Sequence, residues 1–121
     1  NDDSESTSPW QEYMASMPGD SFLRSLRQSI VCELPTGEMS IDSVAVDLGV
    51  SRRTLQRRLS DRETNFQHIV QELRYQMALR FLADKGMGVT SIAFLLGYAD
   101  SSSFSTAFKS WHGCSPSEYR L

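Results

Sequence analysis

One short basic segment carries the side chains with the clearest capacity for chemistry. Residues 51–59 read Ser-Arg-Arg-Thr-Leu-Gln-Arg-Arg-Leu. Leu55 and Leu59 lie four positions apart, so a helix here would bury both on one face. The opposite face would then present Arg52, Arg53, Gln56 and Arg57. Arginine can form two hydrogen bonds to the major-groove edge of guanine, and glutamine can do so with adenine. These four residues are therefore predicted to contact the bases of double-stranded DNA.

A second segment repeats the spacing with different chemistry. Phe104 and Phe108 are also four positions apart. A helix that buries them turns short hydroxyl groups outward, and we expect base contacts from Ser102, Ser103 and Thr106. Hydroxyl groups can approach bases or phosphates, but they discriminate weakly between bases. The first segment is therefore expected to supply most of the sequence specificity, and the second mainly to anchor the register.

Other polar groups beside these two faces suit the DNA backbone. Contacts to phosphate fix the position of a protein on the duplex without reading its sequence. The N-terminus of a helix adds backbone N–H groups that bind phosphate. On these grounds we predict phosphate contacts from Ser51, Arg58, Arg62, Thr90, Ser101 and Lys109.

Both segments need the same supporting elements. Each follows a short apolar stretch and a glycine, which is Gly49 in the first case and Gly97 in the second. A short helix, a glycine turn and a second helix form a helix-turn-helix. Six positions separate Gly49 from Leu55 and seven separate Gly97 from Phe104, so the second copy has one extra turn residue.

Apolar spacing along the rest of the chain predicts an all-α fold of about seven helices. The expected organisation is an acidic linker with a short helix at residues 1–20, a first helix-turn-helix subdomain at 21–65, a linking helix at 66–86 and a second helix-turn-helix subdomain at 87–121. The linking helix should run from Phe66 to about Lys85, which makes it roughly 30 Å long. Helix N-caps are expected at Asp20 or Ser21, Ser40, Ser51, Thr64 or Asn65, Thr90, and Asp100 or Ser101.

The distribution of charge is more informative than its total. The 121 residues carry a formal net charge of −3. Residues 1–20 hold five acidic side chains and no lysine or arginine, whereas residues 21–121 have a net charge of +2. Residues 51–62 alone hold five arginines against Asp61. A local basic cluster of this kind is typical of a surface that binds nucleic acid.

Several other classes of function find little support. Cys32 and Cys114 form no Cys-x-x-Cys motif, and with His68 and His112 they show no metal-ligand spacing, so we expect no metal and no cofactor. No nucleophile, base and orienting group can be assembled from the sequence, so we expect no enzyme activity. No apolar run approaches the ~18 residues of a membrane span, and the acidic N-terminus is unlike a signal peptide, which favours the cytoplasm.

Motifs in both copies follow a known pattern. The second copy contains Ile92-Ala-x-x-x-Gly-Tyr98, Phe104-x-x-x-Phe-Lys109 and Gly113-x-Ser-Pro-x-x-Tyr-Arg120. The first copy contains Val-Ala-x-x-Leu-Gly-Val-Ser-x-Arg-Thr-Leu-Gln-Arg at residues 44–57. Over residues 21–121 these motifs resemble the DNA-binding domain of the AraC/XylS family of bacterial transcription regulators.

The resemblance implies two homeodomain-like units whose reading helices enter successive major-groove segments of one duplex. By position, it assigns base reading to Arg53, Gln56 and Arg57 in the first unit and to Ser102, Ser103 and Thr106 in the second. It also implies a nucleoid-associated regulator, more often an activator, that contacts RNA polymerase and responds to an effector through a separate N-terminal domain. The isolated domain is expected to be monomeric. The alternative left open is an all-α protein-interaction module that does not bind DNA.

Overall fold

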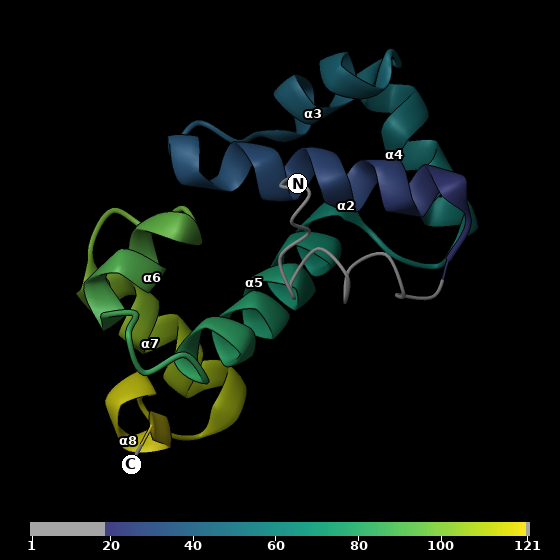
Figure 1. The fold of residues 1–121 in the computed structure, drawn as a ribbon. Helices are drawn as coiled ribbons and strands as arrows, with labels where there is room; N and C mark the ends of the chain where they lie inside the picture. The colour runs from purple at the N-terminus through teal and green to yellow at the C-terminus, as the bar shows by residue number, and fades with distance from the viewer. Residues whose placement is uncertain (1–18, 121) are drawn as a thin grey trace, which may run out of the picture.

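The chain folds into two helical units on either side of one central helix (Figure 1). The structure is a computed structural model that describes residues 19–120. Within that range it contains seven α-helices, one short 3-10 helix and no strand. In chain order they are α2 (Ser21–Glu33), η1 (Leu34–Thr36), α3 (Ile41–Leu48), α4 (Arg52–Asp61), α5 (Phe66–Leu82), α6 (Val89–Leu95), α7 (Ser101–His112) and α8 (Pro116–Arg120). The all-α prediction is confirmed, while the short helix expected at residues 10–17 lies outside the described residues.

Side-chain caps fix where most of the helices begin. In five helices the N-cap side chain accepts a hydrogen bond from the backbone N–H three residues later, which satisfies one of the free donors of the first turn. These caps are Asp20, Ser40, Ser51, Asn65 and Asp100. The sequence identified each of these positions, alone or as one of two candidates.

The expected cap at Thr90 is wrong. The N-cap of α6 is Gly88, which makes no side-chain hydrogen bond, and Thr90 is the exposed second residue of the helix. Starting the helix at Val89 packs that side chain against the core together with Ile92 and Ala93. Burial of an apolar side chain stabilises this start more than a threonine cap two residues later would.

The linking helix α5 is shorter than the sequence suggested. It ends at Leu82 rather than near Lys85, and its 17 residues span roughly 25 Å. Two contacts close this end. The Asp84 carboxylate accepts a hydrogen bond from the Gly86 N–H at 2.9 Å, and Arg120 donates to the carbonyl oxygens of Leu82 and Asp84, each at 3.2 Å. The guanidinium from the far end of the chain thus caps the C-terminus of the central helix.

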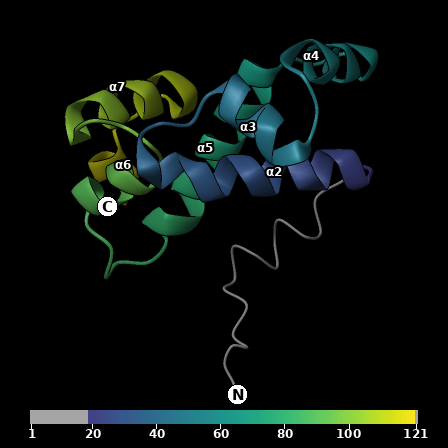
Figure 2. The ribbon, with the colours of Figure 1, turned by 90° about the horizontal axis from the view of Figure 1, so that it is seen from above.

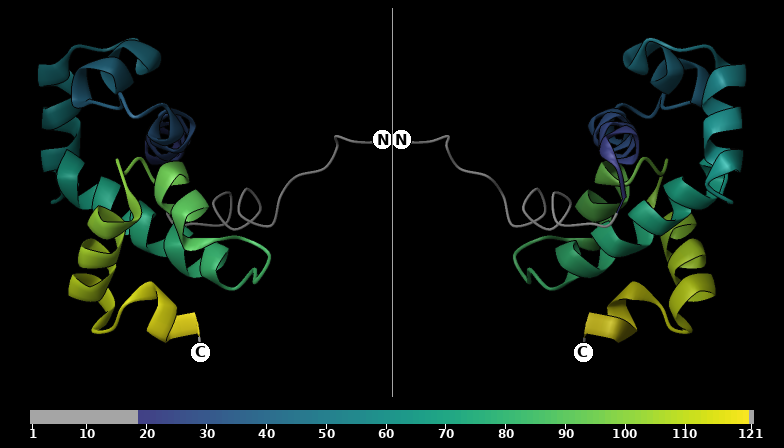
Figure 3. Two further views of the ribbon diagram at one scale, coloured as in Figure 1. Left: turned by 90° about the vertical axis from the view of Figure 1, so that its left-hand side faces the viewer. Right: turned by 90° about the vertical axis from the view of Figure 1, so that its right-hand side faces the viewer.

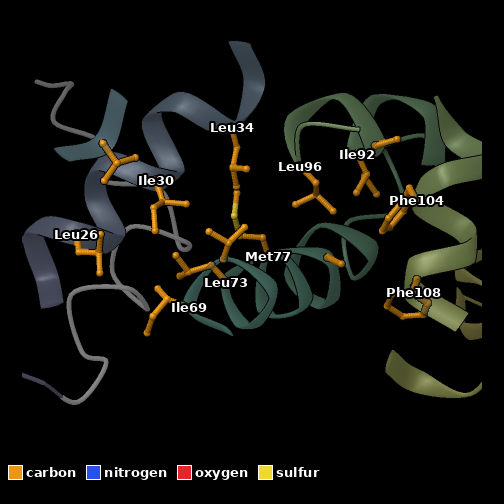
Figure 4. Close-up of a cluster of buried hydrophobic side chains, with 14 of the residues drawn as sticks. Leu26, Ile30, Leu34, Ile69, Leu73, Met77, Ile92, Leu96, Phe104 and Phe108 are labelled. Carbon is orange, nitrogen blue, oxygen red and sulfur yellow. The ribbon is translucent and has the colours of Figure 1, made fainter. Parts of the chain in front are cut away.

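A continuous apolar core runs through both units (Figure 4). Leu26, Ile30 and Leu34 approach α5 from the first unit, and Ile92, Leu96, Phe104 and Phe108 lie on the side of the second. Leu73 and Met77 of α5 lie between the two groups and are almost fully buried. Because α5 is covered from two sides, it is part of the core of both units.

The turn of the second unit is packed directly against the first. Gly97 has a φ of +88°, and a Cβ atom there would lie only 2.9 Å from the carbonyl oxygen of Leu34 in η1. Arg74 of α5 donates from Nε to the Leu96 carbonyl oxygen at 2.9 Å, and its guanidinium lies 4.8 Å from the centre of the Tyr98 ring. The two units are therefore joined by direct packing in addition to the linking helix.

Two carboxyl groups meet where α2 packs on α3. Ser29 Oγ donates to Asp47 Oδ2 at 2.7 Å, and Ser43 Oγ donates to Glu33 Oε1 at 2.5 Å. A hydrogen bond between the two acids raises the pKa of Glu33 above its ordinary value of 4.5 and lowers that of Asp47 below 3.8. Of the two acids, Glu33 therefore holds its proton to higher pH than Asp47 does.

This pair makes stability depend on pH. The pKa of Glu33 is raised in the folded state. The stability that this group contributes is therefore complete below pH 4.5, and it is lost as the pH rises through the folded-state pKa. The contribution of Asp47 has the opposite sign and is lost as the pH falls through its lowered pKa. Glu33→Gln keeps a hydrogen-bond donor at every pH, so the variant should lose less stability than the wild type as the pH rises from about 4 through the raised pKa of Glu33. Urea unfolding of both proteins across that range measures the difference, and parallel pH profiles would contradict the prediction.

Candidate nucleic-acid interface

Helix α4 presents its predicted polar face to solvent. The Ser51 hydroxyl accepts the N–H of Thr54 and starts the helix, while Leu55 and Leu59 are buried at 0% and 1% exposure. Burial of these two leucines turns the other side of the helix outward. That side carries the exposed side chains of Arg53, Gln56 and Arg57. The first helix-turn-helix therefore has the orientation that the leucine spacing predicted.

Arg52 is also exposed but already has a partner. Its Nε donates to Asp42 Oδ1 at 2.7 Å and its Nη2 to Asp42 Oδ2 at 2.5 Å. The hydrogen bonds from Arg52 lower the pKa of the Asp42 carboxyl, which keeps it ionised at neutral pH. Arg52 thus lies on the outward side as expected, with one edge of its guanidinium held by Asp42 of α3.

Arg62, which is also predicted to contact phosphate, already has protein partners. It donates from Nε and Nη2 to Asp20 Oδ2 at 3.2 and 2.6 Å, and from Nη1 to the Arg58 carbonyl oxygen at 2.8 Å. Its guanidinium lies 4.7 Å from the centre of the Phe22 ring, and that of Arg58 lies 5.4 Å from the same ring. Both arginines thus pack against the start of α2, and Arg62 fastens α4 to it. Asp20 is 42 positions from Arg62, so local sequence patterns did not reveal the contact.

Helix α7 is the counterpart of α4 in the second unit. Phe104 and Phe108 are fully buried, and the exposed side holds Ser102, Ser103, Thr106 and Lys109, with Ser101 half-buried at the start. Asp100 Oδ1 accepts the Ser103 N–H at 2.8 Å, and hydrogen bonds from the first turn lower the pKa of Asp100. An ionised carboxylate therefore already neutralises the positive end of this helix, which weakens its attraction for a phosphate.

The two polar faces belong to helices on the same side of the molecule. Seen from above, α4 and α7 lie along one edge, with α5 between the two units and α2 farther back (Figure 2). Both side views show the same arrangement (Figure 3). The turn glycines support the equivalence of the two units, because Gly49 and Gly97 both have positive φ, at +72° and +88°. The two helices that carry the residues predicted to read bases thus lie along one edge of the molecule.

Comparison with known proteins agrees with this geometry. A family model described as a helix-turn-helix domain, of the AraC/XylS type, matches residues 44–121. The chain belongs to the AraC/XylS family. It is 37% identical over 87 residues to the HTH-type transcriptional regulator VirS of Mycobacterium tuberculosis, a match that covers 72% of this chain and 26% of VirS. The chain thus spans about a quarter of the length of that relative.

Solved structures of AraC/XylS proteins share the fold. The C-terminal domain of AraT, a response regulator from Geobacillus stearothermophilus, is 31% identical, with a TM-score of 0.71 and 84% of each chain covered. A DNA-binding transcriptional dual regulator from Escherichia coli is 26% identical, with a TM-score of 0.64, and the match covers 78% of this chain and 94% of that one. The chain is accordingly a DNA-binding domain of a transcription regulator of this family.

The relatives are regulators of transcription rather than enzymes. Across residues 19–120, no three side chains of the metal-binding types gather closely enough to hold an ion. None of the helices in that range has the length and apolar character needed to span a membrane. His112 Nδ1 lies 2.8 Å from the Tyr75 hydroxyl and its ring stacks on Phe108, which gives this histidine a packing role.

Proposed function

We propose that the chain binds double-stranded DNA sequence-specifically, with α4 in one major-groove segment and α7 in the next. The observation that carries the proposal is the common edge on which the two helices lie (Figures 2 and 3). Reading helices placed this way meet one face of a duplex, where successive major-groove segments are roughly 34 Å apart. We retain the division into a first subdomain at residues 21–65, a linking region at 66–86 and a second subdomain at 87–121.

The two helices are assigned unequal roles. In α4, Arg53, Gln56 and Arg57 are exposed, and their side chains have the bidentate chemistry that distinguishes guanine and adenine. In α7, Ser102, Ser103 and Thr106 offer single hydroxyl groups, which suit weaker base contacts or phosphates. The proposed phosphate contacts are Ser51, Arg58, Arg62, Thr90, Ser101 and Lys109. The first unit should therefore dominate sequence selection.

The affinity for DNA should fall steeply with salt. Each cation that meets a phosphate releases a counterion, which adds about −0.9 to the slope of log K against log salt. On a random-sequence duplex the arginines of α4 meet phosphates instead of matching bases, so with about five basic contacts we expect a slope near −4 to −5. Fluorescence anisotropy over a salt series measures it. A slope near zero, or no binding at low salt, would reject DNA binding and favour the protein-interaction alternative.

Selection from a random pool of duplexes, followed by sequencing, tests whether one or two half-sites are read. Two conserved blocks about one helical turn apart would support the proposed arrangement. A single block would restrict base reading to α4. The same experiment supplies the selected duplex used in the tests below.

The role of the whole protein follows from the family. We propose that this domain works in the bacterial cytoplasm, on the nucleoid, as part of an activator of transcription. By family resemblance, we also propose that the protein contacts RNA polymerase. An effector that binds a separate N-terminal domain would control it. The domain itself should be monomeric, which sedimentation of the 121-residue chain would show directly.

A further inference from the structure

Two carboxylate–guanidinium pairs hold the ends of α4, and they differ in exposure. At the C-terminal end, the Arg62 side chain is 29% exposed, with hydrogen bonds to Asp20 and to the Arg58 carbonyl. At the N-terminal end, the side chains of Arg52 and Asp42 are 55% and 61% exposed. Within residues 19–120, Asp42 is the only hydrogen-bond partner of the Arg52 side chain. The first pair is part of the packing, whereas the second is open to exchange.

The Arg52–Asp42 pair lies where DNA is expected to approach. Arg52 is the first residue of α4, and the N-terminal residues of a reading helix contact base edges. Arg52 donates to Asp42 through Nε and Nη2, the same edge of the guanidinium that can bind a guanine or a phosphate bidentately. While the pair is intact, Asp42 therefore competes directly with either ligand and cancels the charge of Arg52.

We propose that Asp42 is a specificity-determining residue that limits non-specific DNA binding by occupying Arg52. Non-specific affinity comes almost wholly from cations that meet phosphates, and Asp42 withholds one of them. At a matching DNA sequence, the acceptor atoms of a base can take over both hydrogen bonds that Arg52 otherwise donates to Asp42. Arg52 therefore leaves Asp42 mainly at such a sequence. An exposed ion pair contributes little to stability, so the exchange carries only a small penalty. This inference rests on the proposed DNA binding.

The test is Asp42→Asn in the 121-residue chain, measured on a random-sequence duplex and on the selected duplex. On the random duplex we expect binding to tighten by about fivefold. The slope of log K against log salt should become more negative by about 0.9, because one more cation meets a phosphate. Affinity for the selected duplex should change less, so the ratio of specific to non-specific affinity falls.

Asp20→Asn is the matched control. It makes the same change of charge, and asparagine caps a helix as well as aspartate, so α2 keeps its start. Arg62 retains its bond to the Arg58 carbonyl and its contact with Phe22. We therefore expect no steeper salt slope. If Asp20→Asn gained as much affinity for the random duplex as Asp42→Asn, the change in net charge alone would explain the effect. That result would overturn the proposal.

A double-mutant cycle with Arg52→Gln completes the design. In the Arg52→Gln background, Asp42→Asn should no longer steepen the salt slope, because the arginine that it would release is absent. If the wild type binds the random duplex and Asp42→Asn binds it equally or more weakly, Asp42 does not restrain Arg52. If the wild type binds no duplex, the proposed function fails instead. Circular dichroism confirms that each variant is folded.

Discussion

Arg57→Ala is expected to weaken binding to the selected duplex by roughly 5- to 150-fold, about 1–3 kcal/mol. Arg57 is exposed on the face of α4 opposite the buried Leu55 and Leu59. A bidentate contact between arginine and guanine both adds affinity and discriminates against the other bases. The loss should therefore be accompanied by relaxed preference at one position of the first half-site. Anisotropy on the selected duplex and on single-base variants of it measures both effects.

Ser102→Ala and Thr106→Ala provide the comparison in the second unit. Each removes one hydroxyl group from the exposed side of α7 and leaves the buried phenylalanines in place. We expect smaller losses than for Arg57→Ala, with little change in base preference. Equal losses in both units would contradict the assignment of most specificity to α4. A uniform loss across all sequences in Arg57→Ala would make that residue a phosphate contact.

Gly97→Ala should lower the free energy of unfolding by about 2–4 kcal/mol. One part of the cost is conformational, because a φ of +88° is unfavourable for a residue with a Cβ atom. The larger part is steric, since that Cβ would lie 2.9 Å from the Leu34 carbonyl oxygen and 3.3 Å from the Arg74 guanidinium. Backbone cannot move aside as a flexible side chain can. Urea unfolding compares the variant with the wild type.

Gly49→Ala separates the two contributions. Gly49 is the equivalent turn residue of the first unit, with a φ of +72°, but a Cβ there would meet no atom within 4 Å. Its replacement should cost only the conformational part, about 1 kcal/mol. If both variants lose the same free energy of unfolding, the close contact between Gly97 and Leu34 of η1 does not contribute to stability.

The sequence predicted the parts of this domain that depend on local spacing. Leucines and phenylalanines four residues apart determine which side of α4 and α7 is buried, so the outward residues of both helices could be named in advance. The caps of α4 and α7 were similarly accessible, because a cap and the N–H that it accepts lie three residues apart. The outward direction of Arg53, Gln56 and Arg57 was therefore readable from residues 51–59 alone.

Contacts between distant residues limited the prediction elsewhere. The shorter α5 is closed in part by Arg120, which is 38 positions from Leu82. The placement of Arg62 depends on Asp20, and that of Arg52 on Asp42 across the turn of the first unit. A basic side chain in a sequence shows its charge but not the carboxylate that neutralises it. Asp42 was missed for this reason, although an acid in the first turn of the helix before a basic reading helix is a signal to search for.

The close joint between the units limits the spacing of half-sites on the DNA. Because Gly97 lies against η1 and Arg74 bonds to the Leu96 carbonyl, the second unit has no free hinge on which to swivel about α5. One extra base pair between two half-sites turns the second by about 34° around the duplex axis. A swivelling linker would absorb that change of helical phase. This domain would instead have to twist the DNA or release one of its two contacts.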